Sequence, residues 1–185
     1  ETLDTLVATT PTTSGAFLCD ANMYHIRSKQ LYRQSPNQSP ALSYEVGPKL
    51  TTAVINAIGF NSLDGFIYGI VTTSGDGLTA GHLVRYGSDG VPISMGAITG
   101  SMTAADLTAI RGGDTDDAGN LIVGKGSSST SIYSINIATL VSTTITLSSA
   151  VTANDLAYSN GKIYAQYADK FFKITKDAAP DYSWV

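Results

Sequence analysis

Three short polar residues stand at corresponding places in three similar segments of the chain. Asn56, Asp106 and Asp155 lie in INAIG, ADLTA and NDLAY, and each is expected at the start of a strand. If those strands surround a common axis, two carboxylates and an amide ring one mouth of a central channel, where oxygen ligands suit a hard cation such as Ca²⁺. Short polar side chains also cap exposed backbone N–H groups, and we favour this structural interpretation.

A second acidic cluster lies in the segment GDTDDAGN, which contains Asp114, Asp116, Asp117 and Asn120. A calcium-binding EF-hand loop needs about twelve residues with a closing Glu, and that pattern is absent. Because the cluster falls at an expected hairpin, an acidic turn is favoured over a metal loop. We therefore expect no cofactor, with Ca²⁺ as the alternative.

Residues typical of an active site are scarce. Neither His25 nor His82, the two histidines of the chain, has a Cys or a second His at zinc spacing. The sequence contains no G-x-S-x-G nucleophile motif and no recognisable pair of catalytic carboxylates. We predict no catalytic residues, and a binding role is favoured over an enzymatic one.

The charge balance limits the classes of partner. The net charge is −4 and the isoelectric point is about 4.9, and Lys and Arg form no run along the chain. Such a surface does not attract polyanions, so nucleic acid is not an expected partner. No apolar stretch approaches the roughly 18 residues that span a bilayer, so no membrane span is expected.

Several features are compatible with a secreted or cell-surface protein. Lys is infrequent, Thr and Ser are frequent, and the sequence starts at Glu1 without Met, which suggests a processed or trimmed N-terminus. Asn37 opens the sequon NQS, which a eukaryotic secretory pathway can glycosylate. Cys19 is the one cysteine, so we expect either a buried thiol or a disulfide with a cysteine in another chain or in a portion of the protein removed from this one.

Period-2 alternation and short apolar runs predict strands along most of the chain. Only SMTAADLTA could form a helical turn, and its Thr residues weaken that prediction. Three hairpin turns recur, in DGFIYG, AGNLIVG and NGKIYAQ, where Gly supplies the positive φ of a tight turn. A third and a fourth strand follow each hairpin, which indicates an internal repeat.

The repeat predicts an all-β fold. We expect an N-terminal extension, residues 1–13, and one domain, residues 14–185, with repeat units at about 14–50, 51–100, 101–150 and 151–185. Four-stranded units of this length are typical of β-propeller blades, which bury their faces against one another. The four units would form a small closed ring or a segment of a larger one. The alternative is a β-sandwich.

The series NAIGFNSLDGFIYGI, LVRYGSDG, GDTDDAGNLIVG with IYSINIATL, and NDLAYSNGKIYA resembles an uncharacterised propeller-type domain family of secreted and surface proteins in fungi and bacteria. The FLCD segment, Phe17 to Asp20, resembles the start of that domain, and the similarity runs from about residue 16 to residue 176. The resemblance implies an extracellular setting and supplies no catalytic residues.

Three functions follow as hypotheses. The favoured one is a non-catalytic extracellular binding or surface module that recognises a protein or glycan partner. The first alternative is a structural subunit of an extracellular fibre or oligomer, which would self-associate. The second alternative is a polysaccharide hydrolase or lyase whose site lies at the channel mouth, near Asp106 and Asp155.

Overall fold

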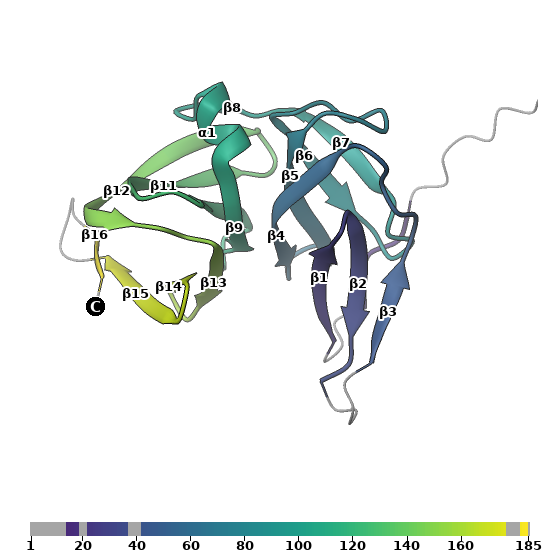
Figure 1. The fold of residues 1–185 in the computed structure, drawn as a ribbon, viewed down its shortest axis with the longest axis horizontal. Helices are drawn as coiled ribbons and strands as arrows, with labels where there is room; N and C mark the ends of the chain where they lie inside the picture. The colour runs from purple at the N-terminus through teal and green to yellow at the C-terminus, as the bar shows by residue number, and fades with distance from the viewer. Residues whose placement is uncertain (1–13, 19–21, 37–41, 177–181, 185) are drawn as a thin grey trace, which may run out of the picture.

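The recurring hairpins of the sequence form antiparallel strand pairs throughout the part of the chain that the structure describes (Figure 1). The computed structural model describes residues 14–18, 22–36, 42–176 and 182–184. Within these residues there are sixteen strands and one short helix, so the predicted all-β class is confirmed. Among them, no helix is long and apolar enough to cross a membrane.

The described strands fall into four antiparallel groups, which we number in chain order. Group 1 comprises β1 (Met23–Arg27), β2 (Gln30–Gln34) and β3 (Ser43–Val46). Group 2 comprises β4 (Val54–Asn61), β5 (Phe66–Thr73), β6 (His82–Tyr86) and β7 (Pro92–Ala97). Group 1 has three strands where four were expected. Residues 16–18, which precede group 1, form no strand.

The C-terminal half contains the other two groups. Group 3 comprises β9 (Ile110–Thr115), β10 (Asn120–Lys125), β11 (Ser129–Asn136) and β12 (Val141–Val151), and the short β8 (Thr99–Gly100) pairs with β12. Group 4 comprises β13 (Asp155–Ser159), β14 (Lys162–Tyr167), β15 (Lys170–Lys176) and β16 (Tyr182–Trp184). A parallel pair between Leu147 and Tyr182 joins groups 3 and 4 into one nine-stranded sheet.

Helix α1 (Ala104–Ala109) precedes β9 and lies where a strand was expected to begin at Asp106, so that prediction is wrong. The Thr103 side chain accepts a hydrogen bond from the Asp106 backbone N–H, and the Asp106 carboxylate accepts one from the Thr103 backbone N–H. This reciprocal capping box starts a helix, and the Ala residues that follow have high helix propensity. The strand therefore begins only at Ile110.

Three apolar clusters lie between successive groups. Groups 1 and 2 share a core that includes Leu31, Ile55 and Val84. Groups 2 and 3 share one that includes Ile70, Leu83 and Ile110, and groups 3 and 4 share one that includes Ile132, Leu156 and Ile174. Each fully buried Ile or Leu contributes roughly 1.5–3 kcal/mol. A series of three cores differs from the single core that the alternative β-sandwich would have.

The first strand of each group lies beside the first strand of the next. β1 contacts β4, β4 contacts β9, and β9 contacts β13. In the described part of the chain the series does not close, because β1 and β13 lie at its two ends, on either side of β4 and β9 (Figure 1). The arrangement is an open arc with the four first strands on its inner side.

Candidate ligand-binding cavity

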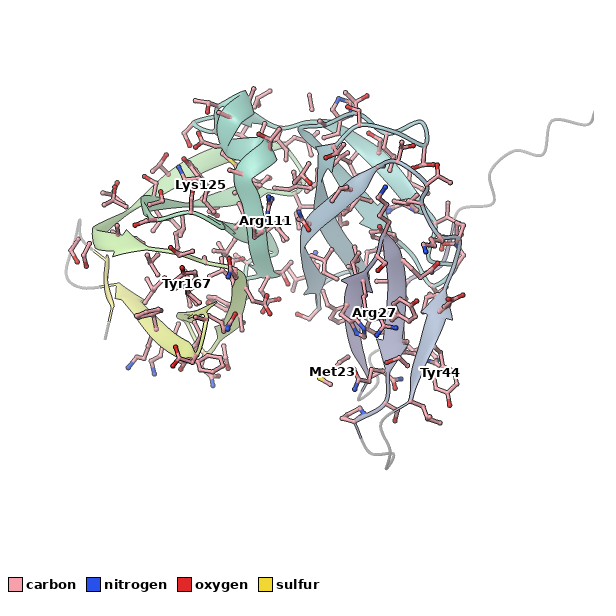
Figure 2. The ribbon with its side chains drawn as sticks, viewed as in Figure 1. Met23, Arg27, Tyr44, Arg111, Lys125 and Tyr167 are labelled. Carbon is pink, nitrogen blue, oxygen red and sulfur yellow. The ribbon has the colours of Figure 1, made fainter. Side chains whose placement is uncertain are left out.

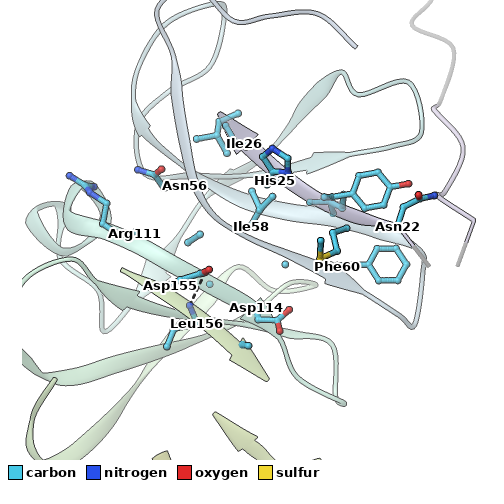
Figure 3. Close-up of a pocket in the computed structure, with 18 of the residues that line it drawn as sticks. Asn22, His25, Ile26, Asn56, Ile58, Phe60, Arg111, Asp114, Asp155 and Leu156 are labelled. Atoms are coloured by element: carbon cyan, nitrogen blue, oxygen red, sulfur yellow. Dashed lines mark hydrogen bonds between the residues drawn. The ribbon is translucent and has the colours of Figure 1, made fainter. Parts of the chain in front are cut away.

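The first strands of all four groups line one cavity of about 640 Å³. Its lining comes from β1 (residues 23–26), β4 (residues 55–60), β9 (Arg111, Gly113 and Asp114) and β13 (residues 155–157) (Figure 3). The volume lies within the range of roughly 300–1,000 Å³ that is usual for ligand pockets. Residues distant in the sequence thus meet at the inner side of the arc.

Glycines explain why three of these strands approach closely. A Cβ on Gly59 of β4 would lie 2.7 Å from the backbone carbonyl carbon of Asp114, and one on Gly112 of β9 would lie 2.6 Å from that of Asp155. Side chains at these two positions would hold the backbones of neighbouring strands apart. β1 contains no glycine, and the cavity extends between β1 and the other three strands.

A β-bulge in β4 shapes the cavity wall. The register with β5 shifts between Asn56 and Gly59, and Ala57 has a φ of 55°. A non-glycine residue in this region is strained by roughly 1–3 kcal/mol, and bulges re-aim the side chains beside them. Asn56 and Ile58, on either side of Ala57, both line the cavity.

Two polar side chains at one end of the cavity come from β4 and β9 (Figure 3). The Asn56 side-chain amide donates to Thr72 Oγ1 at 3.3 Å. Arg111, which is exposed, donates from Nη1 to the Ile110 backbone carbonyl at 2.8 Å. Figure 2 shows Arg111 between the two halves of the molecule, where it faces solvent at the inner side of the arc.

Asp114 and Asp155 form an acidic part of the lining. Asp114 accepts the backbone N–H of Thr115 at Oδ1 and that of Tyr158 at Oδ2, both at 2.8 Å. Burial raises the pKa of Asp114, these two hydrogen bonds lower it, and the negative charge of Asp155 raises it further, so that the net shift is upward. Within the described residues, no Lys or Arg forms an ion pair with either carboxylate.

The opposite wall of the cavity is apolar. Ile26, Ile58 and Phe60 line it. Met23 also lines the cavity and is 52% exposed. The cavity therefore combines an apolar wall with a few polar groups, which is the usual composition of a ligand site.

Asp106 does not line this cavity, so the prediction that it begins an inner strand beside Asn56 and Asp155 is wrong. It lies in α1, where Oδ1 pairs with Lys125 Nζ at 2.9 Å and Oδ2 accepts from the Thr103 hydroxyl at 2.7 Å. Partial burial raises the pKa of Asp106, but the hydrogen bonds from Thr103 and Lys125 outweigh burial and hold that pKa well below its usual range. Its role is to fasten α1 to β10.

Of the remaining residues of the acidic cluster, Asp116 and Asp117 lie in the turn between β9 and β10, and Asn120 is the first residue of β10. Asp116 accepts the backbone N–H groups of Ala118 and Asn120, and also the Asn120 side-chain amide. Asp117 accepts the Tyr158 hydroxyl at 3.1 Å. Among the described residues, no group of three or more His, Cys, Asp and Glu side chains could hold a metal ion.

The two histidines, Cys19 and Asn37 were also singled out in the sequence, and of those that the structure describes, His25 alone lies at the cavity. The His25 ring, at the cavity edge, stacks on Tyr32 with 5.5 Å between ring centroids. His82 Nδ1 lies 2.9 Å from Ser94 Oγ on the strands β6 and β7. Cys19 and Asn37 lie outside the residues that the structure describes.

The sequence interpretation missed Arg111 and the apolar wall from β1 and β4. The glycines of the first strands were a usable signal, because a glycine inside a strand often marks a close approach of another backbone. Arg111 directly precedes the Gly112-Gly113 pair in β9. The backbones of β13 and β4 approach closely at these two glycines, and Arg111 therefore lies beside the other inner strands. A pattern among sequence neighbours does not reveal which side chains line a cavity that four distant segments form together.

Comparison with known proteins identifies a family without a described activity. A family model with the description "Repeat of unknown function (DUF6923)" matches residues 17–178, which is most of the chain. No curated protein matches the sequence. The expected similarity to an uncharacterised repeat domain is therefore confirmed.

Proposed function

Since this chain belongs to the DUF6923 family of repeats of unknown function, we propose its function from its own cavity: it is a non-catalytic module that binds a partner at the inner side of the arc. The observation that carries this proposal is the convergence of all four first strands on one cavity with an apolar wall and polar groups. Binding sites of this kind hold ligands by apolar contact and orient them by a few hydrogen bonds.

The proposal includes a propeller-type architecture. Each strand group would be one blade, and β1, β4, β9 and β13 would be the innermost strands around the axis. Face-to-face packing of successive groups over three cores supports this, because blades bury their apolar faces only against neighbouring blades. The cavity would then be the axial channel, open on the side between β1 and β13.

An extracellular setting is part of the same proposal. Its support is the composition, with 14% charged residues and a single cysteine, together with the sequon at Asn37. A partner would then be a protein or a glycan of the extracellular space. The acidic net charge of −4 argues against nucleic acid as the partner.

The raised pKa of Asp114 beside Asp155 favours a second candidate, a polysaccharide hydrolase or lyase with this carboxyl pair at its site. A general acid must present its proton to the substrate. Both oxygens of Asp114 already accept backbone N–H groups at 2.8 Å. Because both oxygens are engaged by the backbone, Asp114 is poorly placed to transfer a proton to a substrate. The binding function is therefore the better supported of the two.

The test is a binding screen with matched variants. The full chain is screened against a phage-displayed heptapeptide library and a glycan array, and the bound probes are measured against Arg111→Glu, Asp155→Lys and the control Asp169→Lys. Arg111, Asp155 and Asp169 are all exposed, and only the first two line the cavity. We expect the cavity variants to weaken binding by about tenfold or more and the control to retain it. Equal binding by all three variants would refute the site.

A further inference from the structure

We propose that the partner is a neutral glycan chain, which extends from the cavity across the exposed face of group 4 and stacks on Phe171. This inference rests on the proposed binding function and names the chemical class of the partner. It adds a second contact surface on β14 and β15, whose residues do not line the cavity.

The strand register defines this exposed face of group 4, which we call the outer face. Cross-strand partners lie on the same side of a sheet, and successive residues of a strand lie on opposite sides. The outer face consists of a row of Asp155, Gln166 and Phe171 and a row of Ala157, Tyr164 and Lys173. The other side of the sheet carries Leu156, Ile163 and Ile174, which are buried in the core shared with group 3. The outer face therefore points away from group 3.

Solvent reaches much of the outer face. Phe171 is 77% exposed. Asp155, Ala157 and Lys173 are exposed as well, and Gln166 and Tyr164 are partly exposed. A ligand that covered the Phe171 ring would gain free energy from the apolar surface removed from water.

The outer face is continuous with the cavity. Asp155 and Ala157 of β13 belong to the two rows and also line the cavity. Neighbouring strands lie about 4.8 Å apart, so the row from Asp155 on β13 to Phe171 on β15 spans roughly 10 Å. A single sugar ring does not cover this distance together with the cavity, whereas a chain of several sugars does.

The composition of the outer face differs from that of the three cores between the groups. Those cores consist mainly of Ile, Leu and Val, and the two rows contain none of these residues. Each row instead places an aromatic ring beside a hydrogen-bonding side chain, Phe171 beside Gln166 and Tyr164 beside Lys173. Another strand group packed here would remove these polar side chains from water at a cost in free energy. A ligand rich in hydrogen-bonding groups suits this face better.

A glycan chain has the required chemistry. A sugar ring presents C–H groups on its faces, which contact aromatic rings, and hydroxyl groups around its rim, which exchange hydrogen bonds with amide, carboxylate and ammonium groups. Charges of both signs are spread over this side of the sheet, with Asp155 and Lys173 in the two rows and Lys162 in the adjoining row. Such a surface does not select a polyanion or a polycation, so we expect a neutral chain.

Calorimetric titration of the full chain with neutral sugars tests the length of the site. The probes are cellohexaose, chitohexaose and laminarihexaose, each compared with the disaccharide of the same linkage. We expect at least one hexasaccharide to bind about tenfold or more tightly than its disaccharide, because the longer sugar alone reaches both the cavity and Phe171.

Two substitutions of Phe171 test the stacking contact. Phe171→Leu removes the aromatic ring but keeps an apolar side chain, and it should weaken binding of the hexasaccharide by about tenfold. Phe171→Trp is the matched control, which keeps an aromatic ring and should bind within about threefold of the native chain. Because Phe171 is largely exposed, both variants should retain the native melting temperature.

The outcomes separate this inference from the proposed function. If Arg111→Glu and Asp155→Lys weaken hexasaccharide binding while Phe171→Leu does not, the outer face is overturned and the binding cavity stands. If Phe171→Leu weakens binding while Arg111→Glu does not, the cavity is overturned and the outer-face contact alone stands.

Two further results would overturn the glycan class. One is binding of heptapeptides alone. The other is a mass by light scattering that rises with concentration in the native chain and not in Phe171→Leu, which would make the outer face a contact between two copies of this chain. If neither sugars nor peptides bind the full chain, both proposals are overturned.

Discussion

Asp114 and Asp155 come from different strands, β9 and β13, and their charges interact in the lining of one cavity, because the charge of Asp155 contributes to the raised pKa of Asp114. The two residues are far apart in the sequence, and the close approach of β9 and β13 at Gly112 brings them together. This coupling gives the first testable consequence of the fold.

Asp155→Asn should lower the pKa of Asp114 toward its ordinary value, since one of the causes that raise it is removed. The carboxyl carbon of Asp114, followed by NMR over a pH titration, measures this directly. The matched control Asp169→Asn removes a carboxylate that does not line the cavity, and it should leave the titration of Asp114 unchanged. An unchanged titration in Asp155→Asn would contradict the coupling.

The same pair gives a pH dependence of stability. A carboxyl whose pKa is higher in the folded state than in the unfolded state, where it is about 3.9, favours folding while protonated. That contribution is present below the unfolded pKa and is lost as the pH rises through the raised folded pKa of Asp114. The free energy of unfolding, measured with urea at about pH 4 and at about pH 8, should therefore fall with rising pH in both proteins. The fall should be smaller in Asp155→Asn than in the native chain.

Asp76 should show the opposite pH dependence. The Thr51 hydroxyl and the backbone N–H groups of Ala53 and Thr52 donate to its carboxylate and hold its pKa well below the usual range. The contribution of Asp76 to the stability of the fold is present above the unfolded pKa of about 3.9 and is lost as the pH falls below it. Asp76→Asn should lower the melting temperature at neutral pH, and the difference from the native chain should shrink in acid. A constant difference would contradict this.

Gly59→Ala should destabilise the fold, since its Cβ would lie 2.7 Å from the Asp114 backbone. Crowding of this kind costs about 1–3 kcal/mol. Gly15→Ala is the control, because its Cβ would meet Ser88 Oγ at an ordinary 3.7 Å. Urea denaturation of the three proteins measures the difference, and equal stability of the two variants would show that β4 and β9 are not in tight contact.

A substitution of Asp106 tests whether this residue caps helix α1 or takes part in ligand binding. Asp106→Ala removes the capping box with Thr103 and the contact with Lys125. We expect a loss of about 1–2 kcal/mol in the free energy of unfolding. Peptide or glycan binding by the folded variant should stay within about twofold of the native value, because Asp106 does not line the cavity. A selective loss of binding would restore Asp106 as a site residue.

Much of the local structure could be read along the chain. Hairpins at Gly65, Gly119 and Gly161 were predicted from short-range turn chemistry, and all three glycines have positive φ in the structure. The all-β class followed from alternation, which depends on near neighbours in the sequence. Helix α1 was underestimated because its stability comes from the reciprocal bonds of Thr103 and Asp106, which propensity does not record.

The candidate site could be predicted only in part. Asn56 and Asp155 were named from the repeat, and both line the cavity, whereas Asp106 is displaced into a helix. Arg111, Ile26 and Ile58 were not found, because a side chain lines this cavity through the distance between strands of different groups. The distance between the strands is short where glycines permit backbone contact, as between β4, β9 and β13. It is larger between β1 and these three strands. The local sequence pattern therefore determined the strands and their hairpins. The cavity between the four first strands was decided only by the packing of the groups against one another.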